Sequence, residues 1–415
     1  MKKLSYFLAF LLIFTLCLVS CGENEPGGTS SGTMFGAKET SSSVQLSVSV
    51  GVLDPTDNPE SLFEPMVSNG KQETDVMQDD KYDAVFLNIS IADFLSAGFA
   101  FGDSCDIVFS NGLTFTDLPF YNGYYVRTGA PLIVGYPGYK YVAVTCNNQG
   151  LWTKSGLKDG DNAVVTLREA GKYADVQEAL SQTYSNDRNE YPDDETFVNF
   201  RALRGGRLKQ DFLYRGASPV DSQKNRAAYA DALIAGKEVG FILDLADSQT
   251  DMEGYLARLG FSSDYARGLY ENGKIALLGM SSNYGSDAYK QKLASGLVQM
   301  LGAEGRIYIH CLEGKDRTGF VCLLLEALAG ASYDEMLSDY MKTYENYYGV
   351  TKESAKEKYD AIADLYFNAF VSYLHGTEDI ETLKTAVYEQ DAEQYLADAG
   401  MTEEEIRSLK TLITG

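Results

Sequence analysis

The N-terminal part of the chain carries the short alternating and apolar runs that are typical of β-strands. Residues 44–50 alternate apolar and polar side chains with period two, which places one face of a strand in a core. Further apolar runs, separated by Gly, Asn and Asp turns, occur at 84–91, 131–134, 139–144 and 163–167. Because few helical stripes interrupt these runs, the pattern predicts a β-rich sandwich or barrel domain over residues 40–170.

The second half alternates between helical periodicity and short apolar strands. Residues 170–195 are helical, then polar and acidic, so we expect a domain boundary there. Helical spacing recurs at 222–236, 286–301 and 318–330, and apolar strands at 240–245 and 306–310 lie between these helices. This order predicts an α/β domain over 171–375, with a parallel-sheet core and flanking helices. Residues 376–415 are predicted to form a C-terminal helical appendage.

The first residues read as a targeting signal. Lys2 and Lys3 precede an apolar run at 7–19 that is too short for an ordinary spanning helix. The run ends in LVSC, which resembles the lipobox of bacterial lipoproteins and implies removal of residues 1–20 and lipidation of Cys21. Residues 21–39 are polar and suit a flexible tether. We therefore expect a protein anchored to the cell membrane by its N-terminal lipid and facing outside the cytoplasm.

Composition narrows the functional classes. The 415 residues hold 35 Lys and Arg against 59 Asp and Glu, a net charge of −24, which argues against nucleic-acid binding. Loss of residues 1–20, which contain two Lys and no acid, changes the net charge to −26. A hydrophobic content of 45% excludes a mostly disordered chain. With only two His, a His-rich metal centre is not expected.

Four cysteines lie beyond the signal and the lipidation site. Export would permit a disulfide between Cys105 and Cys146, and two ordinary buried thiols fit the sequence equally well. Cys322 lies on the apolar face of a predicted helix and is assigned to packing. Cys311 is the cysteine with a chemical context.

The segment IHCLEGKDRTG, residues 309–319, joins an apolar strand to an apolar helix, and five residues separate Cys311 from Arg317. Such a loop can turn its backbone N–H groups inward beside the helix N-terminus, which makes a cradle for a tetrahedral dianion. The same field stabilises a thiolate, so we expect Cys311 to be a reactive nucleophile. Arg317 can hold two phosphate oxygens at once.

The other loop residues have supporting roles in this interpretation. The backbone of Leu312, Glu313, Gly314 and Lys315 would bind the substrate phosphate, with glycine allowing a close turn. Thr318 can donate its hydroxyl toward the sulfur, and His310 can hold the turn through backbone groups. The Lys315 ammonium could reach a second phosphate or the leaving group, or remain a solvated side chain.

The motif HCLEGKDRTG resembles the loop of the cysteine-dependent protein tyrosine phosphatases, in detail the atypical bacterial tyrosine and lipid phosphatase branch with its HCxxGKDRTG loop. NFRALRGG at 199–206, LYRGA at 213–217 and SDY at 338–340 resemble further elements of that branch. Ala202 and Ala246 stand where the branch tends to have Asp and Arg, which puts in doubt the substrate contact assigned there. The resemblance implies a phosphocysteine intermediate, no cofactor, no metal, and phosphotyrosine proteins, dual-specificity substrates or phosphoinositides as partners.

The chemistry needs a general acid. Asp244 ends a predicted strand, where α/β sheets place their sites, and matches the family's Asp. Asp247 follows it closely, and Asp316 lies inside the loop. We favour Asp244 and rank Asp316 second, while a structural role as a turn former stays open for each.

Residues 201–215 carry an excess of cations. Arg201 and Arg204 head this segment and are candidate phosphate-binding residues, because a local patch can act despite the global acidity. Pairing with the acids at 190–195 is the alternative.

Other functions stay open from the sequence. The cation excess and export suit a cysteine phytase-like inositol polyphosphate phosphatase. A non-catalytic phosphate-binding module and a rhodanese-type sulfurtransferase, whose loop is usually shorter, are the remaining alternatives. Residues 125–167 are similar to the C-terminal β-domain of SAM-hydroxide adenosyltransferases, a likeness that bears on fold alone.

Overall fold

The computed structural model describes residues 45–64, 67–68, 71–72 and 83–415. The predicted signal segment, Cys21 and the predicted tether lie outside these residues. Gln45–Gly415 form one compact unit that contains a β-barrel and an α/β sheet. No helix built by the described residues combines the length and the apolar character that crossing a bilayer requires.

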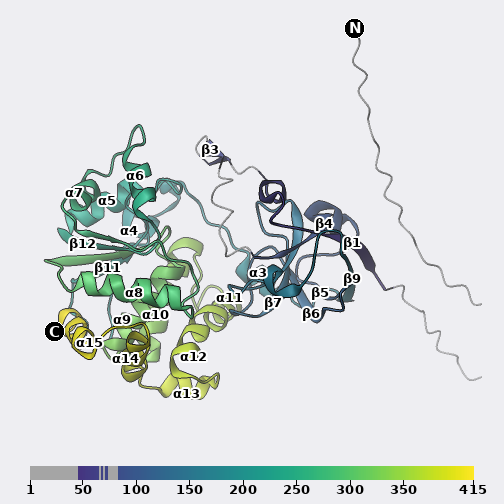
Figure 1. The fold of residues 1–415 in the computed structure, drawn as a ribbon. Coiled ribbons are helices and arrows are strands. Elements are labelled where there is room, and N and C mark those ends of the chain that lie inside the picture. The colour runs from purple at the N-terminus through teal and green to yellow at the C-terminus, as the bar shows by residue number, and fades with distance from the viewer. Residues whose placement is uncertain (1–44, 65–66, 69–70, 73–82) are drawn as a thin grey trace, which may run out of the picture. The chain divides into compact units, whose positions relative to one another are not determined.

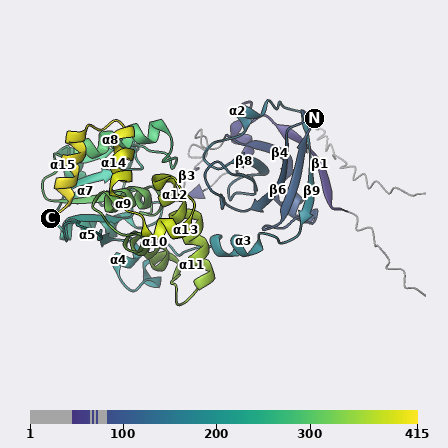
Figure 2. The same ribbon diagram turned by 90° about the horizontal axis from the view of Figure 1, so that it is seen from below.

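The N-terminal strands close into a seven-stranded barrel, so of the two predicted β-architectures the barrel is present. Its order is β1 (Ser47–Leu53), β4 (Val85–Ser90), β8 (Tyr141–Cys146), β7 (Pro131–Val134), β6 (Thr114–Tyr121), β5 (Ser104–Phe109) and β9 (Asn162–Glu169). Figure 2 shows several of these strands around the barrel. All pairs are antiparallel except β6 and β7.

Apolar side chains fill the inside of the barrel. Val52, Leu87, Ile107 and Val165 are buried on its strands, and Phe94 enters from α1 (Ile91–Ser96). A closed barrel of this size has an interior just wide enough for side chains. The interior is therefore a packed core. The remaining elements of this part are η1 (Pro59–Leu62), β2 (Val67–Ser68), β3 (Lys71–Gln72), α2 (Trp152–Ser155) and α3 (Ala174–Leu180).

Cys105 and Cys146 are both free thiols, so the disulfide that the sequence left open is absent between them. Cys105 lies on β5 with its side chain in the barrel core, and burial raises the pKa of its thiol to about 12. A buried, protonated thiol behaves as a small apolar side chain.

The second sheet has the order β10 (Arg201–Ala202), β11 (Leu213–Gly216), β14 (Arg306–His310), β12 (Val239–Asp244) and β13 (Ile275–Leu277). Its last four strands are parallel, and the short β10 is antiparallel to β11. At the carboxyl edge His310 pairs in register with Gly216 on one side and with Asp244 on the other. Three neighbouring strands thus end beside the predicted catalytic loop.

Helices cover both faces of this sheet, as Figure 1 shows. On one face lie α4 (Asp194–Phe197), α5 (Ala227–Gly236), α6 (Gln249–Leu256) and α7 (Asp264–Glu271). On the other face lie α8 (Asp287–Met300), α9 (Asp316–Leu328) and α10 (Tyr333–Tyr348). The predicted parallel-sheet core with flanking helices is present. The α9 helix is buried along almost its whole length, which explains its apolar sequence.

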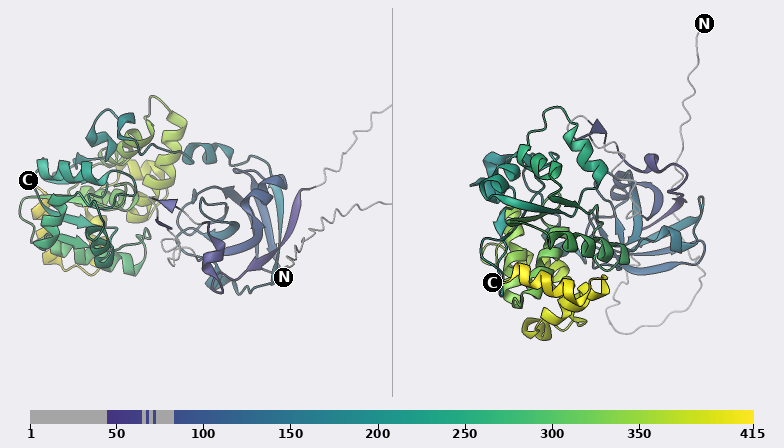
Figure 3. Two further views of the ribbon diagram at one scale, coloured as in Figure 1. Left: turned by 90° about the horizontal axis from the view of Figure 1, so that it is seen from above. Right: turned by 60° about the vertical axis from the view of Figure 1, so that its left-hand side comes forward.

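Residues 376–415, which were expected to form an appendage, pack into the same core. Leu383, Tyr388, Leu396 and Leu409 are buried in the cluster that contains α9. They belong to α13 (Ile380–Thr385), the turn after it, α14 (Glu389–Asp398) and α15 (Glu403–Ile413). Figure 3, on the right, shows this yellow segment against the green helices. The preceding elements are α11 (Lys356–Ile362), the π-helix η5 (Ala363–Asn368) and α12 (Ala369–His375), and η4 is Arg188–Glu190.

Candidate active site

The segment between β14 and α9 is a loop in which the carbonyl oxygens of Leu312, Glu313 and Gly314 accept hydrogen bonds from the surrounding structure. The donors are the N–H of Ser218 to Leu312 O (3.1 Å), the hydroxyl of Tyr347 to Glu313 O (2.7 Å), and Nη2 of Arg215 to Gly314 O (2.8 Å). A trans peptide points its C=O and its N–H in opposite directions. The N–H groups of Glu313, Gly314 and Lys315 therefore point to the inside of the loop.

These inward N–H groups are available to a ligand. Among the described residues, no backbone or side-chain oxygen accepts a hydrogen bond from the N–H groups of residues 312–315. They lie next to the N-terminus of α9, whose own first N–H groups also lack partners within the helix. Converging N–H groups at a helix N-terminus form an anion site. Cys311 begins this loop and is 4% exposed.

Gly314 makes the turn possible. Its φ of +66° lies in the left-handed region that favours glycine, and a Cβ there would stand 2.3 Å from the carbonyl oxygen of Gly216. The backbones of Gly216, at the end of β11, and of Gly314 thus lie in direct contact. A side chain at residue 314 would push the loop away from the sheet edge.

A buried ionic network holds the back of the loop. Arg215 donates to Gly314 O and to Asp339 Oδ2, and Asn199 Nδ2 donates to Gly314 O at 3.1 Å. Arg201 Nε donates to the other carboxylate oxygen of Asp339 at 2.7 Å. Burial works against ionisation of Asp339, but the two guanidinium groups outweigh it and hold its pKa below the usual range. The network fixes the loop from behind.

A further carboxyl group lies near this network. Burial raises the pKa of Glu326 well above its ordinary value, and the neighbouring charge of Asp339 adds to the rise, while Arg215 and Arg201 act against it.

Arg317 stands in the first turn of α9 at the rim of the loop. Its Nη1 donates to the carbonyl of Met280 at 2.9 Å, which orients the guanidinium and leaves its other N–H groups for a ligand. Thr318 Oγ1 is buried and has no hydrogen-bond partner among the described residues. Cys311, Arg317 and Thr318 therefore lie in one short segment that comprises the loop and the first turn of α9.

The comparison with known protein families agrees with this geometry. The family model described as the tyrosine phosphatase family matches residues 195–415, more than half of the chain. The chain belongs to the tyrosine phosphatase family. No curated protein sequence matches it at a significant level.

The matched region places this tyrosine phosphatase family member among hydrolases that act on phosphorylated substrates. The match spans the whole second sheet, the catalytic loop and the helices to residue 415. It leaves out the barrel, whose strands end at Glu169.

Asp244 of this phosphatase is fully buried beneath the loop. Its Oδ1 accepts the N–H groups of Ala246 (2.9 Å) and Asp247 (3.0 Å), the arrangement of a turn-forming Asp. Its Oδ2 lies 3.7 Å from His310 Nε2. Burial raises the pKa of Asp244 to about 6, and burial together with the neighbouring Asp244 raises that of Asp247 to about 8. One of these two carboxyl groups therefore keeps a proton at neutral pH.

His310 is a buried neutral side chain. Burial lowers the pKa of its imidazole to about 4. Its Nδ1 lies 3.3 Å from the carbonyl oxygen of Cys311. The ring therefore supports the first peptide of the loop from below, next to Asp244.

Asp316 differs from Asp244 in its access to solvent. Its side chain is 55% exposed, and its Oδ2 lies 3.9 Å from Lys315 Nζ. The Lys315 ammonium also lies 3.7 Å from Glu313 Oε2 and donates to the hydroxyl of Tyr348 at 3.4 Å. A carboxyl group at the rim of the loop can reach the oxygen of a leaving group, whereas a fully buried one cannot without a rearrangement.

The structure does not bring Arg201 and Arg204 to the phosphate side of the loop. The guanidinium of Arg201 is taken up by Asp339 and Asn199 behind the loop. Arg204 is exposed, and the adjoining residues 205–207 contact the C-terminal end of α9, whereas the catalytic loop precedes its N-terminal end. Arg201 is paired, but with Asp339 and not with the acids at 190–195 that the sequence offered as the alternative.

Several residues that hold the loop were not assigned to the site from the sequence. Asn199, Arg215 and Asp339 lie in the blocks NFRALRGG, LYRGA and SDY, which signalled the family and not these roles. No sequence pattern marks Ser218 or Tyr347. Among the described residues, no group of three or more His, Cys, Asp and Glu side chains is arranged to hold a metal ion.

Proposed function

We propose that this protein hydrolyses phosphate monoesters through a covalent phosphocysteine on Cys311, and that no metal or cofactor takes part. The observation that carries the proposal is the set of inward N–H groups of residues 313–315 between Cys311 and Arg317. Such groups bind three phosphate oxygens and stabilise the charge that develops on them in the transition state.

In the first step the Cys311 thiolate attacks the phosphorus atom, and the bond from phosphorus to the ester oxygen breaks. Loop N–H groups and Arg317 hold the equatorial oxygens. The leaving oxygen takes a proton from a carboxyl group. In the second step a water molecule gives a proton to that carboxylate and attacks phosphorus, the S–P bond breaks, and inorganic phosphate leaves. The hydroxyl of Thr318 stabilises the departing sulfur.

For the general acid we now place Asp316 before Asp244. Asp316 is half-exposed at the rim of the loop, where a leaving group would stand. Asp244 has one oxygen taken by two N–H groups and the other beside His310. A structural role for Asp244 beneath the loop accounts for those contacts.

The substrates we propose are phosphotyrosine proteins, dual-specificity targets or phosphoinositides. The phytase-like alternative depended on a wall of free arginines, and Arg201 is already paired with Asp339. The N-terminal segment supports a further proposal, that residues 1–20 are removed and Cys21 carries a lipid that anchors the enzyme outside the cytoplasm.

Phosphate release from phenyl phosphate and from a phosphotyrosine peptide, measured for the chain lacking residues 1–21, tests the activity. We expect turnover that a chelator leaves unchanged and that Cys311→Ser reduces by at least about a thousandfold. Matched binding of tungstate to both proteins would show that the loop is intact in the variant. Unchanged turnover in Cys311→Ser would refute the assignment of the nucleophile.

A further inference from the structure

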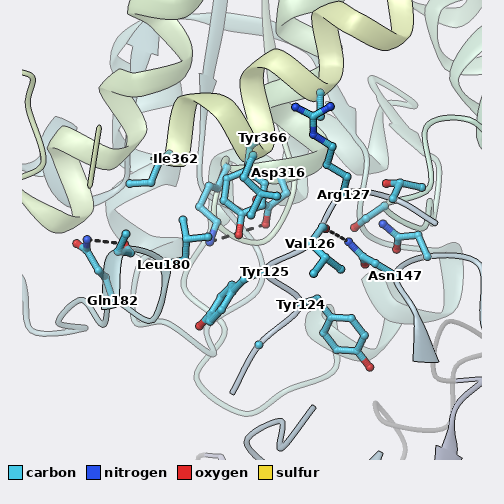
Figure 4. Close-up of a pocket in the computed structure, with 18 of the residues that line it drawn as sticks. Tyr124, Tyr125, Val126, Arg127, Asn147, Leu180, Gln182, Asp316, Ile362 and Tyr366 are labelled. Atoms are coloured by element: carbon cyan, nitrogen blue, oxygen red, sulfur yellow. Dashed lines mark hydrogen bonds and ion pairs between the residues drawn. The ribbon is translucent and has the colours of Figure 1, made fainter. Parts of the chain in front are cut away.

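A cavity of about 490 Å³ lies against the catalytic loop, and the barrel supplies one of its walls. On the catalytic side it is lined by Lys315 and Asp316, and by tyrosines of α10 and η5. On the barrel side it is lined by residues 122–128. Figure 4 shows Asp316 and Tyr366 on the catalytic side, with Tyr125 and Val126 of the barrel facing them. Cavities of this size are typical of small-molecule sites.

The cavity adjoins the phosphate-binding loop on two sides. Asp316 immediately precedes Arg317, and its carboxylate belongs to the lining. Ser282 and Tyr284 also line the cavity, and they follow Met280, whose carbonyl orients the Arg317 guanidinium. The organic part of an ester whose phosphate lies in the loop would therefore extend into this cavity.

Contacts across the cavity mouth hold the barrel wall in place. Arg127 pairs with Glu378 at 3.2 Å and with Asp364 at 3.6 Å. In addition, Asn283 Nδ2 donates to the carbonyl of Asn148 in a second barrel loop at 3.0 Å. The barrel loops are thus attached to η5 through Asp364, to Glu378 after α12, and to the segment that carries Tyr284.

The lining suits a flat ring better than a polyanion. Tyr344 stacks on Tyr348 with centroids 5.7 Å apart and on Tyr366 at 6.3 Å, which makes an aromatic wall. The two cations of the described lining, Arg127 and Lys315, each face two carboxylates. Aromatic walls attract another ring by stacking and edge contacts, and paired cations leave little attraction for extra phosphates.

We propose that the barrel completes the substrate site, and that Tyr125 is a specificity-determining residue that packs against an aromatic ring in the leaving group of the phosphate ester. This inference rests on the phosphatase activity proposed above. It gives the barrel a direct part in substrate binding.

The surroundings of Tyr125 support this role. Its ring lies over Gly123, where a Cβ would stand 2.5 Å from the ring Cζ. Burial raises the pKa of Tyr125 to about 12, and the Lys315 ammonium offsets part of the shift. The hydroxyl therefore stays protonated at neutral pH. Because only the flexible ring opposes a methyl group at residue 123, Gly123→Ala displaces the ring and keeps its chemistry.

Kinetics with two phosphorylated compounds, an aryl phosphate ester and an acyl phosphate, test the proposal on the chain lacking residues 1–21. Phenyl phosphate carries a ring that reaches the cavity, whereas acetyl phosphate carries only a small acyl group. For Tyr125→Ala and Gly123→Ala we expect KM for phenyl phosphate to rise about tenfold. KM for acetyl phosphate and inhibition by vanadate depend on the loop and not on the cavity. Both should stay within about twofold of the wild-type values. Tyr141→Ala, a barrel tyrosine outside the cavity lining, is the matched control.

The outcomes separate this inference from the proposed function. Wild-type protein that releases no phosphate from either compound would overturn the phosphatase assignment, and the inference with it. Active wild-type protein whose KM for phenyl phosphate is unchanged in both variants would overturn the inference alone. Equal increases of KM for both compounds would also overturn it, because they would place the effect in the loop. A preference for inositol hexakisphosphate over phenyl phosphate would contradict the aromatic occupant.

Discussion

Arg215 Nη2 donates to the carbonyl oxygen of Gly314 at 2.8 Å, and this contact ties the end of β11 to the centre of the catalytic loop. The same guanidinium binds Asp339, which Arg201 binds from the other side. The two arginines share one buried carboxylate, but of the two only Arg215 reaches the loop. Comparing variants of the two arginines can therefore separate an effect on the geometry of the loop from an effect on the stability of the protein.

We expect Arg215→Lys to lower kcat/KM for phenyl phosphate about a hundredfold, because the Gly314 carbonyl loses a donor and the Lys315 N–H loses its direction. Arg201→Lys is the matched control, since Arg201 pairs with the same Asp339 carboxylate but does not itself contact the loop. Both variants should lose about 1–3 kcal/mol of unfolding free energy. Similar kcat/KM losses in the two, measured beside thermal unfolding, would show that the network acts through stability alone.

Gly314→Ala should damage both stability and activity. The substitution places a Cβ 2.3 Å from Gly216 O on a backbone with φ +66°. We expect a loss of about 3 kcal/mol or more and turnover near the detection limit. Gly349 has nearly the same φ, +65°, with nothing within 4 Å of its Cβ position.

Gly349→Ala therefore measures the backbone effect without the clash, and it should lose only about 1 kcal/mol with normal kcat. Chemical denaturation and steady-state kinetics on the two alanine variants make the comparison. Equal effects would mean that the contact between residues 314 and 216 is unimportant.

The two acidic candidates predict different dependence on the leaving group. If Asp316 protonates the leaving oxygen, Asp316→Asn should lower kcat for phenyl phosphate about a hundredfold. The loss for 4-nitrophenyl phosphate should be less than tenfold, because the 4-nitrophenolate that leaves is stable without a proton. Asp244→Asn should lower kcat similarly for both esters, because it disturbs the turn beneath the loop. A reversed pattern, in which Asp244→Asn is the variant that discriminates between the esters, would make Asp244 the acid.

The local parts of the fold were predictable from the sequence. The strand predicted at 306–310 has the bounds of β14, and α9 follows it as an apolar helix, because both patterns are set by burial of neighbouring residues. β5 and β6 were missed. Ser104 and Asp106 interrupt the apolar run of β5, and β6 contains Pro119 and a less buried first half.

In the candidate site, too, the features set by neighbouring residues were predictable from the sequence, and those set by distant residues were not. Cys311 and Arg317 could be assigned to one candidate site from the sequence because they lie in one short continuous segment. Arg201 was predicted to bind phosphate because its positive charge is visible in the sequence, whereas the carboxylate with which it pairs is not. That carboxylate belongs to Asp339, 138 residues away along the chain. Long-range partners of this kind depend on the packing of α10 against β10 and β11, which no local pattern describes.

The stability contributed by the buried carboxyl pair should fall as the pH rises from about 4 to about 8. Asp247 ionises near pH 4 in the unfolded chain, but burial and Asp244 raise its pKa to about 8 in the folded state. Between these values the folded state keeps a proton that the unfolded state has lost, so the unfolding free energy falls by up to about 1.4 kcal/mol per pH unit and levels off above pH 8. Asp247→Asn should flatten this slope between pH 6 and about 8, as followed by urea unfolding. Asp264→Asn, which changes an exposed acid in the first turn of α7, should keep the wild-type slope. An unaltered slope in Asp247→Asn would mean that the pair ionises normally in the folded protein.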